Sequence, residues 1–432
     1  MNAAPTLSQQ SSTPTGRADG RRAWTVTALL VVFMMVNFAD KSVLGLAADE
    51  IRADLHLSAT QFGLANSAFF LLFSVSAVVV GLVADRVSPR LLLLVMALLW
   101  SVAQAPAALG GGLAVLVTSR VVLGAAEGPA FPVAQQATLA WFPDHRRNLP
   151  GALITLGVTL GVIVSAPGLS WLIEHHGWRS ALWALAAVGL LWAAAWKLLG
   201  ADGTHATEDT APDAGSRTET ARAVPYRKIL ATRTWIGATL AYFTSYWSVA
   251  LMLVWLPSYL RNALGHPAHT AAVLIVAPWA VGAVALLAQA GITGRLMRRG
   301  VGSRRARGRV GGRLLALGAV CLLSQALVDD PTGKTVLVSL GFGLGGSYAA
   351  VAATTVAELA PAGRSGGALG AMNAVVTAAG LAAPAVVGAL VDARGNDGYH
   401  LAVTLSGALL VIGAAASFLL IDPARDIARL GR

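Results

Sequence analysis

The chain has 432 residues, of which 56% are hydrophobic and only 12% are charged, and its formal net charge is +11. Because soluble domains carry about 25% charged residues, this composition excludes an ordinary soluble protein and favours a membrane protein. The single cysteine, Cys321, excludes an internal disulfide bond and is expected to pack as a small apolar side chain.

Twelve apolar runs follow one another, each long enough to cross a hydrocarbon core about 30 Å thick. They cover residues 24–47, 60–84, 90–109, 113–137, 149–173, 179–200, 233–260, 270–294, 311–329, 335–358, 365–392 and 400–421. Barrel strands would alternate between apolar and polar residues, and these runs do not. We therefore predict an all-α, multi-pass protein of the cell membrane with twelve transmembrane helices.

The basic residues indicate the orientation of the chain. Placing both termini in the cytoplasm collects most Lys and Arg in cytoplasmic segments, which is the positive-inside bias. The strongest patch is the segment 295–313, which holds eight arginines. We interpret it as a determinant of topology that contacts anionic lipid, in preference to a nucleic-acid site.

Polar segments divide the chain into two halves. The expected units are a disordered cytoplasmic tail (1–23), an N-terminal six-helix half (24–200), a cytoplasmic linker (201–232), a C-terminal six-helix half (233–421) and a second cytoplasmic tail (422–432). A weak repeat relates the halves, since Gly151-Ala152-Leu153 is echoed by Gly367-Ala368-Leu369. Parallel, pseudo-symmetric halves of this kind are typical of transporters, whose substrate site lies between them near mid-membrane.

Asp40 and Lys41 stand side by side inside the first apolar run. A charge at this depth costs about 2.5–3.5 kcal/mol on insertion scales, so an ionisable residue there is a candidate functional residue. Adjacent residues of a helix point about 100° apart and do not face each other. Asp40 and Lys41 therefore cannot be each other's ideal partner.

The fourth run contains Arg120 and Glu127, two helical turns apart and hence on one face. Pro129 and Pro132 follow, and they predict a break in this helix. We predict that Asp40 pairs with Arg120 and that Lys41 faces the central cavity. Glu127 is interpreted as a proton-coupling residue; the alternative is a structural ion pair that fixes helix packing.

Two cytoplasmic turns carry further charged residues. The first reads Gly81-x-x-Ala84-Asp85-Arg86-x-x-x-Arg90 between the second and third runs. It resembles the loop signature of the major facilitator superfamily, from which Ser88 and Pro89 depart; an ordinary charged turn is the alternative. In the second turn, Glu358 and Arg364 are expected to form a structural gate pair.

Three motifs resemble the anion:cation symporter family of the major facilitator superfamily. They are Asn37-Phe38-Ala39-Asp40-Lys41, Arg120-x-x-x-Gly124-x-x-Glu127-Gly128-Pro129-x-Phe131-Pro132 and Trp141-Phe142-Pro143. The resemblance implies that Asp40 and Glu127 carry protons and that Arg120 partners Asp40. It further implies that Lys41 meets the substrate carboxylate and that Asn373 contacts the substrate.

Departures from the family pattern bear on the substrate. The family usually has Arg at the position of Lys41, and its sugar-acid members have Tyr at Phe38 and Phe73. Loss of hydroxyl groups from the site favours a less hydroxylated anion. Tyr242, Tyr246 and Trp247 are either an aromatic wall of the same cavity or membrane-facing aromatics.

These observations predict a proton-coupled symporter of an organic anion, a weakly hydroxylated or aromatic monocarboxylate, rather than an enzyme. Its expected partners are the anion, protons and the lipid bilayer, without nucleic acid, cofactor or metal, and a monomer is expected. The alternatives are a proton-driven exporter of an amphipathic or drug-like metabolite and a non-transporting membrane sensor.

Overall fold

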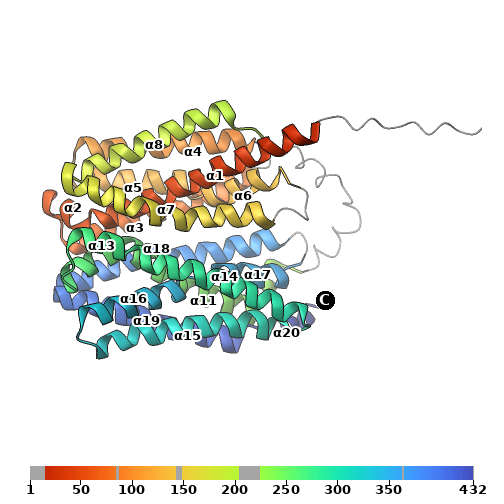
Figure 1. The fold of residues 1–432 in the computed structure, drawn as a ribbon. Helices are drawn as coiled ribbons and strands as arrows, with labels where there is room; N and C mark the ends of the chain where they lie inside the picture. Colours follow the sequence, from red (N-terminus) through yellow and green to blue (C-terminus); the bar gives the residue numbers. More distant parts are fainter. Residues whose placement is uncertain (1–14, 84–86, 143–147, 204–223, 362–363, 432) are drawn as a thin grey trace, which may run out of the picture.

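The computed structural model describes residues 15–83, 87–142, 148–203, 224–361 and 364–431. Within these residues, twelve helical spans are long and apolar enough to cross a membrane, as the sequence predicts. Figure 1 shows them in two layers, with the first half of the chain, red to yellow-green, stacked on the second half, green to blue.

The first half is formed by the spans of α1 and α3 to α8. Their bounds are α1 Thr15–Leu46, α3 Ala59–Val83, α4 Pro89–Leu109, α5 Leu113–Glu127 with α6 Ala130–Leu139, α7 Asn148–His176 and α8 Trp178–Leu199, and the short α2 spans Ala48–Asp54. α1 begins at Thr15, so residues 15–23 are helical where a disordered tail was expected. The end of the molecule where α1 begins is hereafter the termini end, and the opposite end is the α2 end (Figure 1).

The second half follows the linker, of which 204–223 lie outside the described residues. Its main helices are α11 Arg233–Val254, α13 Ala268–Leu274, α14 Val276–Arg298, α15 Val310–Ser324, α16 Pro331–Gly345, α17 Ala349–Leu359, α18 Ser365–Arg394 and α19 Asn396–Leu420. Shorter elements are α10 Tyr226–Leu230, α12 Leu256–Ser258, the π-helices η3 Tyr259–Ala263 and η4 Arg304–Arg309, the 3-10 helix η5 Gln325–Leu327 and α20 Pro423–Arg429.

The fourth span of each half is broken at the same place. α5 has 15 residues and gives way to α6 at Gly128-Pro129, where proline cannot donate a backbone hydrogen bond. α16 also has 15 residues and gives way to α17 near Gly346. This correspondence supports the expected pseudo-symmetry of the two halves.

Glycines allow the halves to meet. α3 packs along α18 across the interface. A Cβ atom at Gly63 would lie 2.2 Å from the backbone oxygen of Pro384, and one at Gly388 would lie 2.3 Å from that of Ala59. Only glycine fits such an approach, because a side chain would force the two backbones apart.

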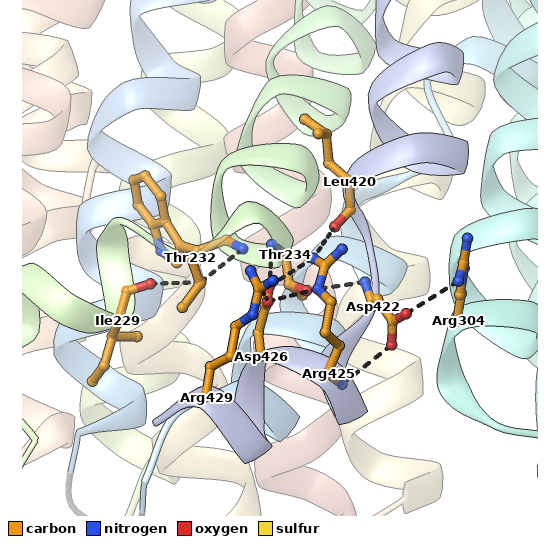
Figure 2. A network of polar contacts seen from close by, with 10 residues as sticks. Ile229, Thr232, Thr234, Arg304, Leu420, Asp422, Arg425, Asp426 and Arg429 are labelled. Carbon is orange, nitrogen blue, oxygen red and sulfur yellow. Dashed lines mark hydrogen bonds and ion pairs between the residues drawn. The ribbon is translucent and has the colours of Figure 1, made fainter. Parts of the chain in front are cut away.

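At the termini end, α20 is fixed to the start of α11 through a buried carboxylate (Figure 2). Asp426 accepts hydrogen bonds from the Thr234 backbone N–H at 2.8 Å and from Arg425 Nε at 2.9 Å. Burial raises the pKa of Asp426, but the hydrogen bonds from Arg425 and Thr234 outweigh burial and hold it below its ordinary value. Asp422 also pairs with Arg304 at 3.2 Å.

Candidate functional site

The buried charges of the first half form one cluster around the last two turns of α1. Lys41 Nζ donates to Asn37 Oδ1 one turn earlier on α1 and lies 2.9 Å from Glu127 Oε2 on α5. The two charged side chains are 9% and 0% exposed. Lys41, which was predicted to face the central cavity, is thus neutralised by Glu127 in this conformation.

Asp40 has a partner that was not predicted. Gln104 Nε2 on α4 donates to Asp40 Oδ2 at 3.0 Å, and both residues are buried. Arg120 is close enough to act electrostatically on Asp40, but the contacts among described residues include no ion pair between them. The expected Asp40–Arg120 pair is thus wrong for this conformation, in which a neutral amide takes that place.

Several polar atoms of the cluster lack hydrogen-bond partners among the described residues. They are Asp40 Oδ1, both carboxylate oxygens of Glu127, Arg120 Nε, Gln104 Oε1 and Asn37 Nδ2. The Lys41–Glu127 contact is therefore close enough for an ion pair but not aligned as a hydrogen bond. Since buried polar groups are normally satisfied, this concentration of unsatisfied atoms is typical of a site that receives a proton or ligand.

Aromatic rings surround the ammonium group of Lys41. Its Nζ lies 4.5 Å from the ring centre of Phe38, 5.5 Å from that of Phe73 and 5.8 Å from that of Phe69. These distances allow cation–π attraction. Phe38 and Phe73, which were expected to line the substrate cavity, thus lie beside Lys41, while Phe69 was missed.

The second half reaches this cluster through aromatic contacts. Tyr246 on α11 meets Phe70 at a ring-centre distance of 6.1 Å, and Tyr242 lies 6.2 Å from Tyr246. Trp279 on α14 meets Phe38 at 6.4 Å. Tyr246 therefore lies at the interface between the halves, and Tyr242 packs against it on the same helix.

Asn373 lies on α18, one turn before Thr377. The Thr377 hydroxyl donates to the Asn373 carbonyl at 2.9 Å. Thr377 also hydrogen-bonds Ser74 across the interface between the halves. The Asn373 side chain is exposed and makes no hydrogen bond to the cluster within the described parts of the chain.

Only one of the three charged residues predicted to have a structural role in the first cytoplasmic turn is described by the structure. Asp85 and Arg86 lie outside the described residues. Arg90 joins α4 to the end of α8, since its backbone N–H donates to Asp202 at 3.0 Å and its Nη2 to the Lys197 carbonyl at 2.8 Å.

The expected Glu358–Arg364 pair is replaced by other contacts. Glu358 accepts from Ser303 Oγ at 2.6 Å and pairs with Arg307. The guanidinium carbon of Arg364 instead lies 4.6 Å from the ring centre of Tyr226. Arg307 was missed because eight arginines crowd its segment and spacing does not identify which one turns inward.

The halves are latched together at the α2 end. Arg261 of the second half pairs with Glu50 at 2.8 Å and lies 3.6 Å from Asp49. Asp49 also accepts from Asn262 at 3.0 Å. Asp392 on α18 accepts from the first backbone N–H groups of α3, at 2.7–2.8 Å.

Two cavities lie between the halves on the side of this latch. The outer one, about 270 Å³, is lined by Glu50, Glu174 and Arg261 among others. The inner one, about 10 Å³, is lined by Ser42 and Trp279 among others. Leu46, Pro257 and Ile275 line both cavities and separate them. These apolar side chains thus pack between the two halves at the α2 end.

Besides Phe69, Gln104 and Trp279 are residues of this site that were not singled out from the sequence. Gln104 was detectable as an uncharged polar residue inside the otherwise apolar run 90–109. Trp279 had no distinguishing signal, because a tryptophan in a membrane helix faces lipid as readily as protein.

A two-layer bundle of twelve candidate membrane-spanning helices with a buried charged site is typical of secondary transporters. Residues 30–355 match the family model for the Major Facilitator Superfamily, and the chain belongs to that family. It is accordingly a multi-pass transporter of the cell membrane and not an enzyme.

Relatives cover nearly the whole chain. A probable sulfoacetate transporter of Cupriavidus necator is 30% identical over 92% of this chain and 93% of its own length. The hexuronate transporter of Bacillus subtilis is 27% identical, with coverage of 90% and 92%. The D-galactonate transporter of Escherichia coli is 26% identical, with coverage of 95% and 98%. The resemblance stated from the motifs is thereby confirmed.

Solved structures share the fold. A bacterial homologue of the human lysosomal transporter Spinster superposes with a TM-score of 0.77 at 17% identity, covering 95% of this chain and 98% of its own. The D-xylose–proton symporter superposes with a TM-score of 0.74 at 14% identity, covering 93% and 99%. At these identities the likeness concerns the fold alone.

Proposed function

We propose that the protein is a proton-coupled symporter of an organic anion. The observation that carries this proposal is the buried contact between Lys41 and Glu127, 2.9 Å apart. A substrate carboxylate needs Lys41 as its cationic partner, and Glu127 competes for the same ammonium group. A proton on Glu127 removes this competitor, so that proton binding and anion binding favour each other.

Charge balance supports the same coupling. With both carboxylates ionised, Asp40, Glu127, Lys41 and Arg120 sum to zero. Binding of a monoanion leaves the site with one uncompensated negative charge, which is costly at membrane depth. One proton restores neutrality for the crossing of a monoanion such as acetate or benzoate, whereas a dianion such as sulfoacetate needs two.

The walls of the site favour a substrate with few hydroxyl groups. Phe38, Phe69 and Phe73 surround Lys41 and offer no hydrogen bonds. An apolar wall gains little from a sugar-acid hydroxyl, which must give up its water. Sulfoacetate, the substrate in the name of one relative, has a carboxylate and a sulfonate but no hydroxyl. We infer a weakly hydroxylated or aromatic carboxylate as substrate.

Uptake into proteoliposomes tests this function. The panel is acetate, sulfoacetate, benzoate, glucuronate and galactonate, each labelled and assayed with an inward proton gradient, an outward gradient or none. Symport predicts accumulation of acetate, sulfoacetate or benzoate above the level in protein-free liposomes, and only with the inward gradient, since neutral acetic and benzoic acids cross a bilayer unaided. Accumulation driven only by the outward gradient would indicate exchange, as a proton-driven exporter requires. A preference for glucuronate or galactonate would contradict the inferred substrate class but not the proposed symport.

A further inference from the structure

An exposed stripe on α15 changes from basic to apolar along the helix. Arg305, Arg309 and Arg313 recur every four residues from η4 into α15 and are all exposed. Leu317 and Val320 continue the same face and are 55% and 60% exposed. Because this face lies on a membrane-spanning segment, its apolar part contacts lipid acyl chains.

The other face of the same segment is occupied by protein contacts. Arg304 pairs with Asp422 at 3.2 Å (Figure 2), and Arg307 pairs with Glu358. The Gly308 carbonyl accepts from Ser417 Oγ at 2.8 Å. These contacts orient the segment, so that the arginine stripe points outward from the bundle.

The outward arginines have no carboxylate to balance them. No ion pair joins Arg305, Arg309 or Arg313 to an acidic residue within the described parts of the chain, whereas Arg304 and Arg307 both have one. Arg309 and Arg313 are one turn apart on a single face, about 6 Å along the axis. Guanidinium groups at this spacing match the oxygens of one phosphate group.

We propose that this stripe binds an anionic phospholipid. The headgroup phosphate lies between Arg309 and Arg313, with Arg305 adding charge, and an acyl chain lies along Leu317 and Val320. Leu317 is one turn from Arg313, about 6 Å along the helix, which is the order in which a lipid presents its phosphate and its chain. Net negative charge is required, because a zwitterionic headgroup brings its own cation to the stripe. This inference does not depend on the transported substrate.

Native mass spectrometry of the purified full chain, titrated with phosphatidylglycerol or phosphatidylethanolamine, tests the proposal. The variant is the double substitution Arg309→Gln/Arg313→Gln. The matched control is Arg227→Gln/Lys228→Gln, which removes the same charge from exposed residues of α10. We expect wild type and control to bind phosphatidylglycerol about tenfold more tightly than the Arg309/Arg313 variant does. Binding of phosphatidylethanolamine should be weak in all three.

Three results would overturn the proposal. Equal binding of phosphatidylglycerol by the variant would place the lipid elsewhere. An equal loss of phosphatidylglycerol binding in the α10 control would show that the effect comes from the net positive charge of the protein and not from the stripe. Displacement of the lipid by an equal concentration of glycerol 3-phosphate would show that the stripe binds soluble phosphate compounds rather than a lipid. Unchanged thermal unfolding of the variant in lipid-free detergent shows that it is folded.

Discussion

Buried carboxylates of the two halves differ in how completely they are satisfied. Asp426 of the second half is 1% exposed and accepts hydrogen bonds from Thr234 and Arg425. In the first half, Asp40 and Glu127 are also 1% exposed, yet Asp40 has one oxygen without a hydrogen bond and Glu127 has two. A satisfied carboxylate stabilises the fold, whereas an unsatisfied one is left able to change partner or charge.

The two halves also contribute different kinds of side chain to the site. The first half supplies the buried charges, and the second half faces them with the aromatic rings of Tyr246 and Trp279. We therefore expect substitutions in the first half to alter coupling and binding of charge. Those in the second half should alter stability, fit or the balance between conformations.

The largest effect is expected at Lys41. Lys41→Gln removes the cation proposed to bind the substrate and leaves Glu127 buried without its partner, so kcat/KM for uptake should fall about 100-fold or more. Lys41→Arg retains the charge and should retain most activity. Uptake per folded protein in proteoliposomes measures both, and the double variant Lys41→Gln/Glu127→Gln shows whether the site folds without its charges. Near-normal uptake by Lys41→Gln would show that Lys41 does not bind the substrate.

A smaller effect is expected at Gln104. Gln104→Leu removes the hydrogen bond that Asp40 Oδ2 accepts at 3.0 Å. Leaving a buried carboxylate without that bond costs about 1–3 kcal/mol, so uptake should fall roughly tenfold or more. Gln325→Leu is the matched control, because Gln325 is an equally buried glutamine of the second half that donates to Thr404 at 3.2 Å. Equal losses of uptake in Gln104→Leu and Gln325→Leu would show that altered packing, and not the lost hydrogen bond to Asp40, lowers uptake.

The latch at the α2 end should have a modest effect. Arg261→Gln breaks the pairs with Glu50 and Asp49, and Arg261 is 26% exposed. A pair of this exposure contributes about 0.2–1 kcal/mol, so the population open at the α2 end should rise about two- to fivefold at most. Maleimide labelling of Ile275→Cys, in a Cys321→Ser background, measures the opening. Unchanged labelling would show that apolar packing alone holds this end closed.

Asp426 should have the smallest effect on transport. Asp426→Asn weakens the network that holds α20 and should cost about 1–3 kcal/mol of stability, while uptake per folded protein stays near wild type. Because its pKa is lowered in the folded state, the stabilisation is complete above the unfolded pKa of about 3.9. It is lost as pH falls through the lower folded value. Thermal unfolding measured as a function of pH tests this pH dependence of stability. Altered proton coupling in Asp426→Asn would contradict the assignment of proton coupling to the first half alone.

Sequence alone predicts the spans well, because each apolar run is long and bounded by polar residues. It also identifies Asp40, Lys41, Arg120 and Glu127, since charges inside such runs are conspicuous. It does not predict their pairing. Helical periodicity separates Asp40 from Lys41, but the choice between Arg120 and Gln104 depends on how α4 and α5 rotate against α1. The aromatic contact of Trp279 likewise depends on how the halves dock.

The central claim is that protonation of Glu127 transfers Lys41 to the substrate. It is tested most directly by proton uptake of the purified protein in weak buffer, on addition of the carboxylate that stabilises it most in a thermal-shift screen. Wild type should take up about one proton per bound anion. Glu127→Gln should bind the same anion at least as tightly and take up none. Proton uptake that persists in Glu127→Gln, or loss of anion binding by this variant, would contradict the account.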